Sequence, residues 1–261
     1  MPHNVNRRVL CVLLALLPCA AGAFSANGHR IAGILAATLL CERAGAEIAA
    51  LVGNRTLEDL GHWADTVRDD PAWQHSAPWH YLNVDDASAL RALEHPPEGD
   101  AVWAIDSFTR MLADHAQPAA ARATALQFLV HFIVDLHQPL HVGLEADRGG
   151  NTITVRYGRT ETNLHAFWDN DAIVRREQSP ERYARELVGI VASLPRSEAD
   201  TDPLAWASES LAFRSQVYGF DRASGELDRR YLAAAESATE RRLAQAAVRL
   251  AATLNGIFCG G

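Results

Sequence analysis

The stretch HFIVDLHQPLH, residues 131–141, combines a strongly apolar run with three histidines and one aspartate. Apolar side chains surround His131 and Asp135 on nearly every face of a helix, which predicts that this helix is buried. Burying an imidazole and a carboxylate without partners costs several kcal/mol, so the fold must supply hydrogen-bonding neighbours or a positive charge. A bound metal ion would meet this need.

The pattern HxxxD occurs twice, as His131 with Asp135 and as His165 with Asp169. A spacing of four residues places both side chains on one helix face, one turn apart, so each pair can hold one ion. Imidazole nitrogen and carboxylate oxygen suit zinc, although manganese, iron and nickel accept the same donors. One such pair is common as a simple polar contact. Two pairs with His141 between them, in apolar sequence, indicate a metal site.

Helical spacing of apolar residues recurs along the chain and predicts an all-α domain. The expected helices cover Ala32–Leu40, Ala46–Val52, Leu57–Val67, Val102–Ala113, Ala119–Leu136, Tyr183–Leu194, Leu204–Val217 and Leu227–Leu254. Asn27 is the expected cap of the first helix, and Pro139 should end or kink the fifth. The only convincing β signal lies in residues 145–163, where Ile153, Val155 and Tyr157 alternate, and predicts one small β-hairpin.

The N-terminus has the pattern of a secretory signal peptide. Two arginines precede the apolar run Val9–Leu17, and the small residues Ala21-Gly22-Ala23 follow. Cleavage after residue 23 would make Phe24 the first residue of a mature domain of residues 24–261. The absence of lysine among 24 basic residues, together with frequent alanine, indicates a GC-rich bacterial gene. We therefore expect a secreted or periplasmic protein.

The hydrophobic pattern and the net charge limit the possible functions of the protein. No later segment offers about 20 uninterrupted apolar residues, so we expect a soluble product without stable membrane association. The net charge of -8 excludes a broad basic face that would gather nucleic acid by counterion release. A polyanionic substrate would need a local positive focus, and bound metal ions can provide one.

Cys41 and Cys259 remain once Cys11 and Cys19 leave with the signal peptide. In an oxidising compartment such a pair usually forms a disulfide, which would join the two ends of the domain. Two unpaired core thiols are the alternative.

The order of several motifs resembles the zinc-dependent single-strand nuclease family of the S1/P1 type, which includes mung bean nuclease and the plant bifunctional nucleases. The motifs are FSANGH (24–29), WADTVR (63–68), WHYLN (79–83), HFIVDLHQPLH (131–141), GGN (149–151) and NLHAFWD (163–169). The resemblance continues through WASESLAF (206–213) and RLAATLN (249–255), and so spans nearly the whole mature chain. It implies the all-α fold that this family shares with zinc phospholipase C, in a single multi-helix domain.

The resemblance implies three zinc ions. One would be held by Asp65, His80, His131 and Asp135, one by His141, His165 and Asp169, and one by His29, Asp135 and the N-terminal residue. Asp135 would therefore bridge two ions. The N-terminal residue binds through its own amine and carbonyl, so signal cleavage would complete the site. The family usually has Trp at this position, where this chain has Phe24. The other histidines, His62, His75, His95, His115 and His137, fall outside the matched positions and are interpreted as non-ligands.

The catalytic role implied for Asp65 and Asp135 is to hold ions that lower the pKa of bound water toward about 7 and stabilise the attacked phosphate. Arg68 matches a basic residue near the phosphate, where a guanidinium would stabilise transition-state charge. An exposed arginine at a helix end is the alternative for Arg68. Tyr81 would stack on a base or else pack in the core.

Asn83 and Asn151 match a base-contacting pair, although Asn151 also suits a turn after Gly149-Gly150.

From the resemblance as a whole we expect a secreted endonuclease that cuts single-stranded DNA and RNA to 5'-mononucleotides, with 3'-nucleotidase action as a second activity compatible with the resemblance. Zinc phospholipase C, which shares the fold, is the alternative enzyme, although its second pair ends in Glu where this chain has Asp169. A helical protein with purely structural metal ions is the non-enzymatic alternative.

Overall fold

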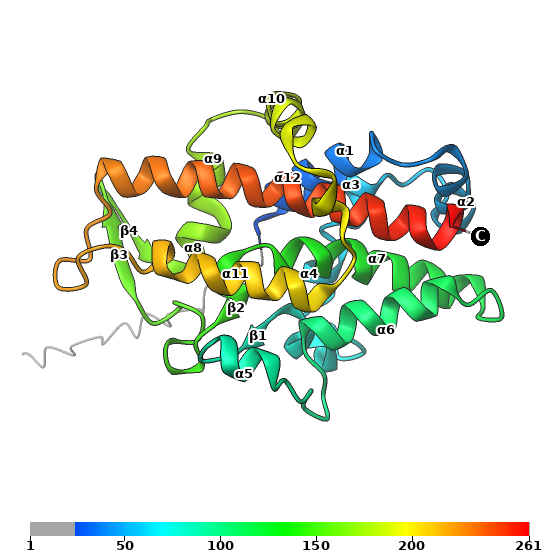
Figure 1. Cartoon of the computed structure of the whole chain (residues 1–261), viewed down its shortest axis with the longest axis horizontal. Coiled ribbons are helices and arrows are strands. Elements are labelled where there is room, and N and C mark those ends of the chain that lie inside the picture. The colour runs from blue at the N-terminus through cyan, green and yellow to red at the C-terminus, as the bar shows by residue number, and fades with distance from the viewer. Residues whose placement is uncertain (1–23, 261) are drawn as a thin grey trace, which may run out of the picture.

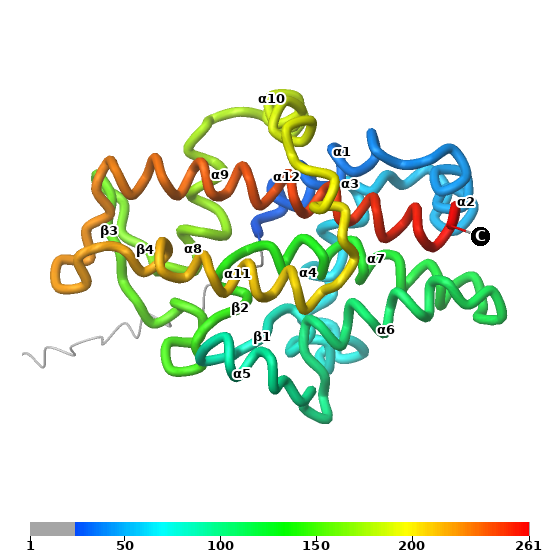
Figure 2. Tube along the Cα trace, in the orientation of Figure 1, coloured from blue at the N-terminus to red at the C-terminus, as the bar shows by residue number. Residues whose placement is uncertain are grey.

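The computed structural model describes residues 24–260, so the expected signal peptide of residues 1–23 lies outside the described residues. Helices form most of this part of the chain, which confirms the all-α prediction (Figures 1 and 2). The longest is α12 (Arg229–Cys259), and α11 (Pro203–Val217) lies beside it. Both pack against α7 (Ala119–Leu136), the helix predicted from the 131–141 stretch.

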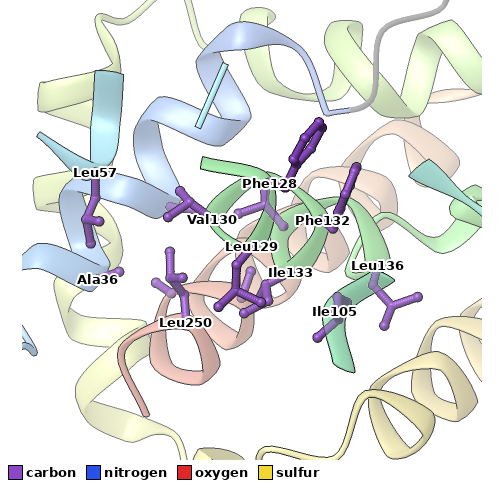
Figure 3. Packing of buried hydrophobic residues seen from close by; sticks show 14 of the residues in the cluster. Ala36, Leu57, Ile105, Phe128, Leu129, Val130, Phe132, Ile133, Leu136 and Leu250 are labelled. Carbon is purple, nitrogen blue, oxygen red and sulfur yellow. The ribbon is translucent and has the colours of Figure 1, made fainter. Parts of the chain in front are cut away.

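Helix α7 occupies the centre of the molecule, and α6 (Ala101–Ala113) packs along it. The helix has the bounds that the sequence predicted: it begins directly after Pro118 and ends at Leu136, three residues before Pro139. Its apolar side chains meet residues from α1, α3, α6 and α12 in one core (Figure 3). Within the described residues, α7 is the single helix long and apolar enough to cross a membrane, but most of it is buried inside this core.

Shorter helices complete the domain. They are α1 (Ala26–Ala37), α2 (Glu42–Val52), α3 (Leu57–Leu60), α4 (Trp63–Thr66), α5 (Ala87–Arg91), α8 (Leu164–Ala166), α9 (Ala172–Val174) and α10 (Pro180–Ser193). Short 3-10 helices cover Gln74–His80, Pro139–His141, Glu145–Asp147 and Arg196–Ala199, and a π-helix covers Phe167–Asp171.

Two helix predictions near the N-terminus were wrong in detail. The expected helix 57–67 is divided into α3 and α4 at Gly61, whose carbonyl accepts a hydrogen bond from the His131 ring at 2.7 Å. Helix α3 ends at Leu60 with Gly61 as its C-cap, and α4 begins at Trp63, so the break lies where the chain contacts His131. Asn27 lies inside α1 and does not cap it, because the helix begins one residue after Ser25.

The predicted hairpin is present as β3 (Thr154–Tyr157) and β4 (Thr160–Asn163), which pair antiparallel with Val155 opposite Thr162. The structure adds a pair that the sequence did not predict. Strands β1 (Leu82–Asn83) and β2 (Val142–Gly143) run parallel, with Leu82 opposite Val142. This short pair joins the segment after His80 to the segment after His141.

A disulfide joins Cys41 to Cys259, across 218 residues of sequence, as predicted. Asn255 of α12 reinforces the link, because its Oδ1 accepts a hydrogen bond from the Cys41 amide at 2.8 Å and its Nδ2 donates to the Leu39 carbonyl at 3.0 Å. The end of α12 is thus fixed beside the segment that joins α1 to α2.

Candidate metal centre

Histidine and aspartate side chains from five regions of the chain meet at the C-terminal half of α7. They are His29 of α1, Asp65 of α4, His80 of the 3-10 helix Gln74–His80, His131 and Asp135 of α7, His141 of the 3-10 helix Pro139–His141, His165 of α8, and Asp169 of the π-helix. All are buried except Asp65, whose side chain is 10% exposed. Three groups of three form within this set, and in each the donor atoms lie within 4.8 Å of one another.

The first group holds His29, His131 and Asp135, and the second holds Asp65, His80 and His131, so the two groups share His131. Oδ2 of Asp135 lies 3.0 Å from Nδ1 of His80 and 3.0 Å from Nε2 of His131, and that Nε2 lies 3.8 Å from Oδ1 of Asp65. Ligands about 2.1 Å from a tetrahedral zinc ion lie about 3.4 Å apart, so these four atoms have the spacing of one coordination sphere. The other carboxylate oxygen, Oδ1 of Asp135, lies 3.1 Å from Nε2 of His29.

His131 can serve only one of the two groups that contain it. Its Nδ1 donates to the Gly61 carbonyl at 2.7 Å, so only Nε2 is left to bind an ion. The same Nε2 lies closest to His80 and Asp135. His29, whose ring stacks on that of His131 at a centroid distance of 4.1 Å, therefore pairs with Asp135 Oδ1 as the nucleus of a separate site.

The third group holds His141, His165 and Asp169. Oδ2 of Asp169 lies 3.1 Å from Nε2 of His165, and Oδ1 lies 3.7 Å from Nε2 of His141. The His165 and Asp169 pair has the four-residue spacing that the sequence indicated, but the second residue sits in a π-helix. The group contains only three protein donors, which leaves a coordination position for a further ligand.

Backbone carbonyls fix the orientation of the histidine rings. Nδ1 of His141 donates to the His80 carbonyl at 2.5 Å, and Nδ1 of His165 donates to the Gly149 carbonyl at 2.7 Å. A carbonyl can only accept a hydrogen bond, so Nδ1 carries the proton and the Nε2 lone pair faces the cluster. This arrangement, which His131 shares, is the usual one for metal-binding histidine.

The residues present fit metal ions because their inward-facing atoms have no other partner. Buried atoms without a hydrogen bond include Nε2 of His29, Nε2 of His141, Oδ1 of Asp135, Oδ1 of Asp65 and Oδ2 of Asp169. Such atoms are costly in a protein interior unless a cation or a proton satisfies them. A cluster of unsatisfied nitrogen and oxygen donors, all aimed at the same region, is therefore well suited to bind divalent ions.

The charges of the cluster also shift its pKa values. Burial opposes the charged form of His131, but the carboxylates of Asp135 and Asp65 outweigh it and raise the pKa of His131 to about 9, so an ion bound at Nε2 would replace a proton there. Burial lowers the pKa of His80 to about 4 despite its contact with Asp135. The pKa of Asp135 is held well below its usual range, because His131 and His141 outweigh the burial of its carboxylate. The pKa of Asp65 is lowered as well, because His131 and His62 outweigh the burial of its carboxylate, so Asp135 and Asp65 both stay anionic.

The model of the S1/P1 Nuclease family matches residues 24–259, which is nearly all of the described chain. The chain belongs to the S1/P1 nuclease family. Among similar proteins, Endonuclease 2 of Arabidopsis thaliana is 32% identical over 263 residues, covering 89% of this chain and 89% of the relative. Nuclease P1 of Penicillium citrinum is 27% identical over 265 residues, covering 90% of this chain and 97% of the relative. This S1/P1 nuclease is therefore an enzyme that hydrolyses nucleic acids.

The structure of this S1/P1 nuclease brings together all eight side chains that the sequence suggested as metal ligands. Phe24, the expected N-terminal ligand, is fully buried, and the amide of the next residue, Ser25, donates to the Asp169 carbonyl at 2.7 Å. The start of the domain is thus fixed beside the third group. Of the suggested non-ligands, His137 faces away from the cluster and accepts a hydrogen bond from Arg249 at 2.9 Å.

The suggested substrate-binding residues have different surroundings. Nη1 of Arg68 lies 3.7 Å from Oδ1 of Asp65, which places the guanidinium at the edge of the cluster. Tyr81 is 41% exposed, so core packing does not explain it. Asn83 is exposed in β1. Nδ2 of Asn151 donates to the Arg148 carbonyl at 2.8 Å, which is the turn contact considered as its alternative role.

Three supporting residues of the site were not found from the sequence. Gln138 is fully buried and donates to Asp169, Gly149 supplies the carbonyl that orients His165, and Gly61 supplies the carbonyl that orients His131. A polar residue inside the buried stretch 131–141 was the available signal for Gln138. Gly149 carried a weaker signal, because two successive glycines also suit an ordinary turn.

Proposed function

We propose that this S1/P1 nuclease is a secreted or periplasmic enzyme with three zinc ions, which hydrolyses single-stranded DNA and RNA to 5'-mononucleotides and has 3'-nucleotidase action as a second activity. The observation that carries the proposal is the use of both Asp135 oxygens. One faces His29 and the other faces His80 and His131. A carboxylate with this geometry can bridge two ions, and a shared ligand keeps them close enough to act on one phosphate.

The proposed ligand sets are those that the family resemblance implies, and the donor groups are compatible with them. Asp65, His80, His131 and Asp135 would hold one ion, and His141, His165 and Asp169 a second. His29 and Asp135 would hold a third with the amine and carbonyl of Phe24. Imidazole and carboxylate donors suit zinc, and the choice of zinc over manganese, iron or nickel rests on the resemblance to the zinc-dependent nucleases.

Bound zinc would supply an activated water molecule and would stabilise negative charge on the attacked phosphate. The protein's own part is to orient the donors, exclude bulk water and place a fixed cation at the rim. The guanidinium of Arg68 can donate two hydrogen bonds to phosphate oxygens, and this interaction strengthens as charge develops in the transition state. In this proposal the chain contributes no amino-acid nucleophile.

We infer a preference for single strands from the exposed ring of Tyr81, the residue that follows His80. Tyr81 directly follows His80, and Asn83 lies two residues further along β1. A base that stacks on Tyr81 would gain about 1–3 kcal/mol with little dependence on its identity. A paired base would first have to leave its duplex, which costs a few kcal/mol. Asn83 and Asn151 would contact the stacked base.

Catalysis is favoured over a purely structural metal site by the three-donor group. Structural zinc sites usually have four protein ligands, whereas His141, His165 and Asp169 leave one position for water or substrate. The proposed location rests on the signal-like segment before Phe24 and on the disulfide, which forms and persists in oxidising compartments.

The test compares substrates on the protein of residues 24–261. Single-stranded DNA, RNA and phosphatidylcholine are incubated side by side, with and without EDTA and with zinc added back. We expect EDTA-sensitive release of 5'-mononucleotides from both nucleic acids and intact lipid. Cleavage of lipid alone would replace the proposal with a phospholipase C. Nuclease activity that survives exhaustive EDTA treatment would rule out the metal mechanism.

A further inference from the structure

Gln138 is a buried polar residue whose position connects the metal-binding groups. It lies three residues after Asp135 and three before His141, at the turn between α7 and the 3-10 helix Pro139–His141. Its side chain is fully buried. A buried amide is costly unless its hydrogen bonds are satisfied, so its partners are informative about its role.

The backbone of Gln138 is bonded to two of the suggested ligands. Its amide donates to the carbonyl of Asp135 at 2.9 Å, and its carbonyl accepts from the amide of His141 at 3.0 Å. The side chain adds a third ligand, because Nε2 donates to Oδ1 of Asp169 at 2.5 Å. One residue thus contacts Asp135 of the central groups and both His141 and Asp169 of the third group.

The two halves of the Gln138 amide have different tasks. Oε1 accepts a hydrogen bond from the Leu140 amide and so caps the 3-10 helix that carries His141. Nε2 binds Oδ1 of Asp169, while Oδ2 of the same carboxylate is the atom that faces His165 without a hydrogen bond. The donor therefore restricts rotation of the Asp169 carboxylate and presents one chosen oxygen to the cluster. A hydrogen bond of this kind to a ligand carboxylate is worth about 10–100-fold in metal affinity.

We infer that Gln138 is a positioning residue that sets the Asp169 carboxylate for metal binding and couples the third group to the end of α7. The inference rests on the proposed metal function but concerns a residue outside the ligand sets. It predicts that loss of the Nε2 donor weakens metal binding at the third group more than at the groups around Asp135.

The variant Q138N separates the two tasks. Asparagine is a favoured capping residue and can still accept from the Leu140 amide, but its amide nitrogen is one carbon–carbon bond too short to reach Asp169. Q138L removes both hydrogen bonds. Q127L is the matched control, because Gln127 is a buried glutamine of α7 whose side chain accepts a hydrogen bond from Arg55 at 2.6 Å, away from the cluster.

The experiment measures zinc stoichiometry and affinity of the purified proteins by titration with a competing chelator, with circular dichroism of the EDTA-treated proteins as the folding control. We expect Q138N to fold as the parent does and to release one zinc ion at about 10–100-fold lower chelator concentration. Q127L should bind zinc as the parent does. Parental affinity of every ion in Q138N would overturn the inference, and so would equal weakening of all ions. A parent protein that binds no zinc would instead refute the proposed function.

Discussion

Nε2 of His29 lies 3.1 Å from Oδ1 of Asp135, and this contact brings the first helix of the described chain against its central helix. His29 is five residues after Phe24, whose side chain is fully buried. The start of the domain is therefore part of the candidate metal centre. Two neighbouring facts support this view: α1 packs against α12, and the Ser25 amide is bonded to the Asp169 carbonyl.

An N-terminal extension should impair the enzyme. If the amine of Phe24 binds a metal ion, one additional alanine before Phe24 converts that amine into a peptide nitrogen that cannot bind the ion, and the ion would shift or be lost. We expect activity on single-stranded DNA to fall about 100-fold, because small displacements of reacting groups cost this much. Zinc content should fall by one ion. One extra alanine after Gly261 is the control, and full activity of the N-terminally extended protein would contradict a role for the terminus.

Arg68 should matter for turnover more than for metal binding. The variant R68A removes a guanidinium that lies 3.7 Å from Asp65 but is not in a ligand group. We expect kcat to fall about 100-fold or more, with zinc content unchanged. R91A is the control, since Arg91 is an exposed residue at the end of α5. If kcat of R68A matched that of R91A, Arg68 would be an ordinary arginine of the protein surface.

Gly149 should tolerate no side chain, because a methyl group there would collide with the backbone. Gly158 has a similar φ but no such contact, so a comparison of the two positions separates the collision from backbone strain. Gly149 and Gly158 have φ of 61° and 57°, but a Cβ on Gly149 would lie 2.7 Å from the Leu140 carbonyl, whereas a Cβ on Gly158 meets no atom within 4 Å. G158A should lose about 1–2 kcal/mol of unfolding free energy from backbone strain alone. G149A should lose roughly 2–5 kcal/mol, because overpacking adds to that strain.

Denaturant unfolding of both glycine variants measures the difference. G149A should also bind zinc more weakly, because the Gly149 carbonyl orients the His165 ring at 2.7 Å. Equal stability of G149A and G158A would show that the loop can move to accommodate the methyl group.

Glu209 should make the stability of the protein sensitive to acid. It accepts hydrogen bonds from two buried arginines, Arg249 at 2.6 Å and Arg242 at 2.7 Å. Burial raises the pKa of Glu209, but the two arginines outweigh it and hold the pKa below its usual value. Its contribution to stability is therefore present above the unfolded-state pKa and is lost as the pH falls through the depressed folded-state value.

The variant E209Q tests whether Glu209 makes the protein less stable as the pH falls. We expect the free energy of unfolding to drop by about 1–3 kcal/mol near neutral pH, and to fall less steeply than the parent's on acidification. E186Q is the control, because Glu186 is exposed and its contact with Arg182 is 3.5 Å long, so its loss should change little. Parallel acid profiles for E209Q and the parent would contradict the prediction.

The central helix could be predicted closely because its limits depend on local chemistry. Pro118 and Pro139 bracket α7, and the apolar positions between them leave no doubt about burial. The pairing of β1 with β2 could not be predicted, since each strand has two residues and the partners Leu82 and Val142 lie 60 positions apart. Such short strands have no periodicity and form only because the surrounding helices bring them together.

The candidate ligands were found by residue type, spacing and motif order, and the structure brings their side chains together. Their supporting contacts were not found, for two reasons. Backbone carbonyls such as that of Gly61 have no signature in sequence, yet one of them orients His131. The bond from Gln138 to Asp169 joins residues 31 positions apart, and its formation depends on the exact length of one side chain.

The bond between Cys41 and Cys259 has a consequence for the way the chain would respond to proteolysis. It encloses residues 42–258 in one covalent ring, so a single cut in any surface loop of that ring leaves both pieces attached to each other. A nicked molecule would migrate as one species until the disulfide is reduced, and could keep its helices in place. The segment from Phe24 to Leu40 lies outside the ring and carries His29. A cut between His29 and Leu40 would leave the piece that carries His29 without a covalent link to the ring, so that non-covalent packing alone would hold it beside Asp135.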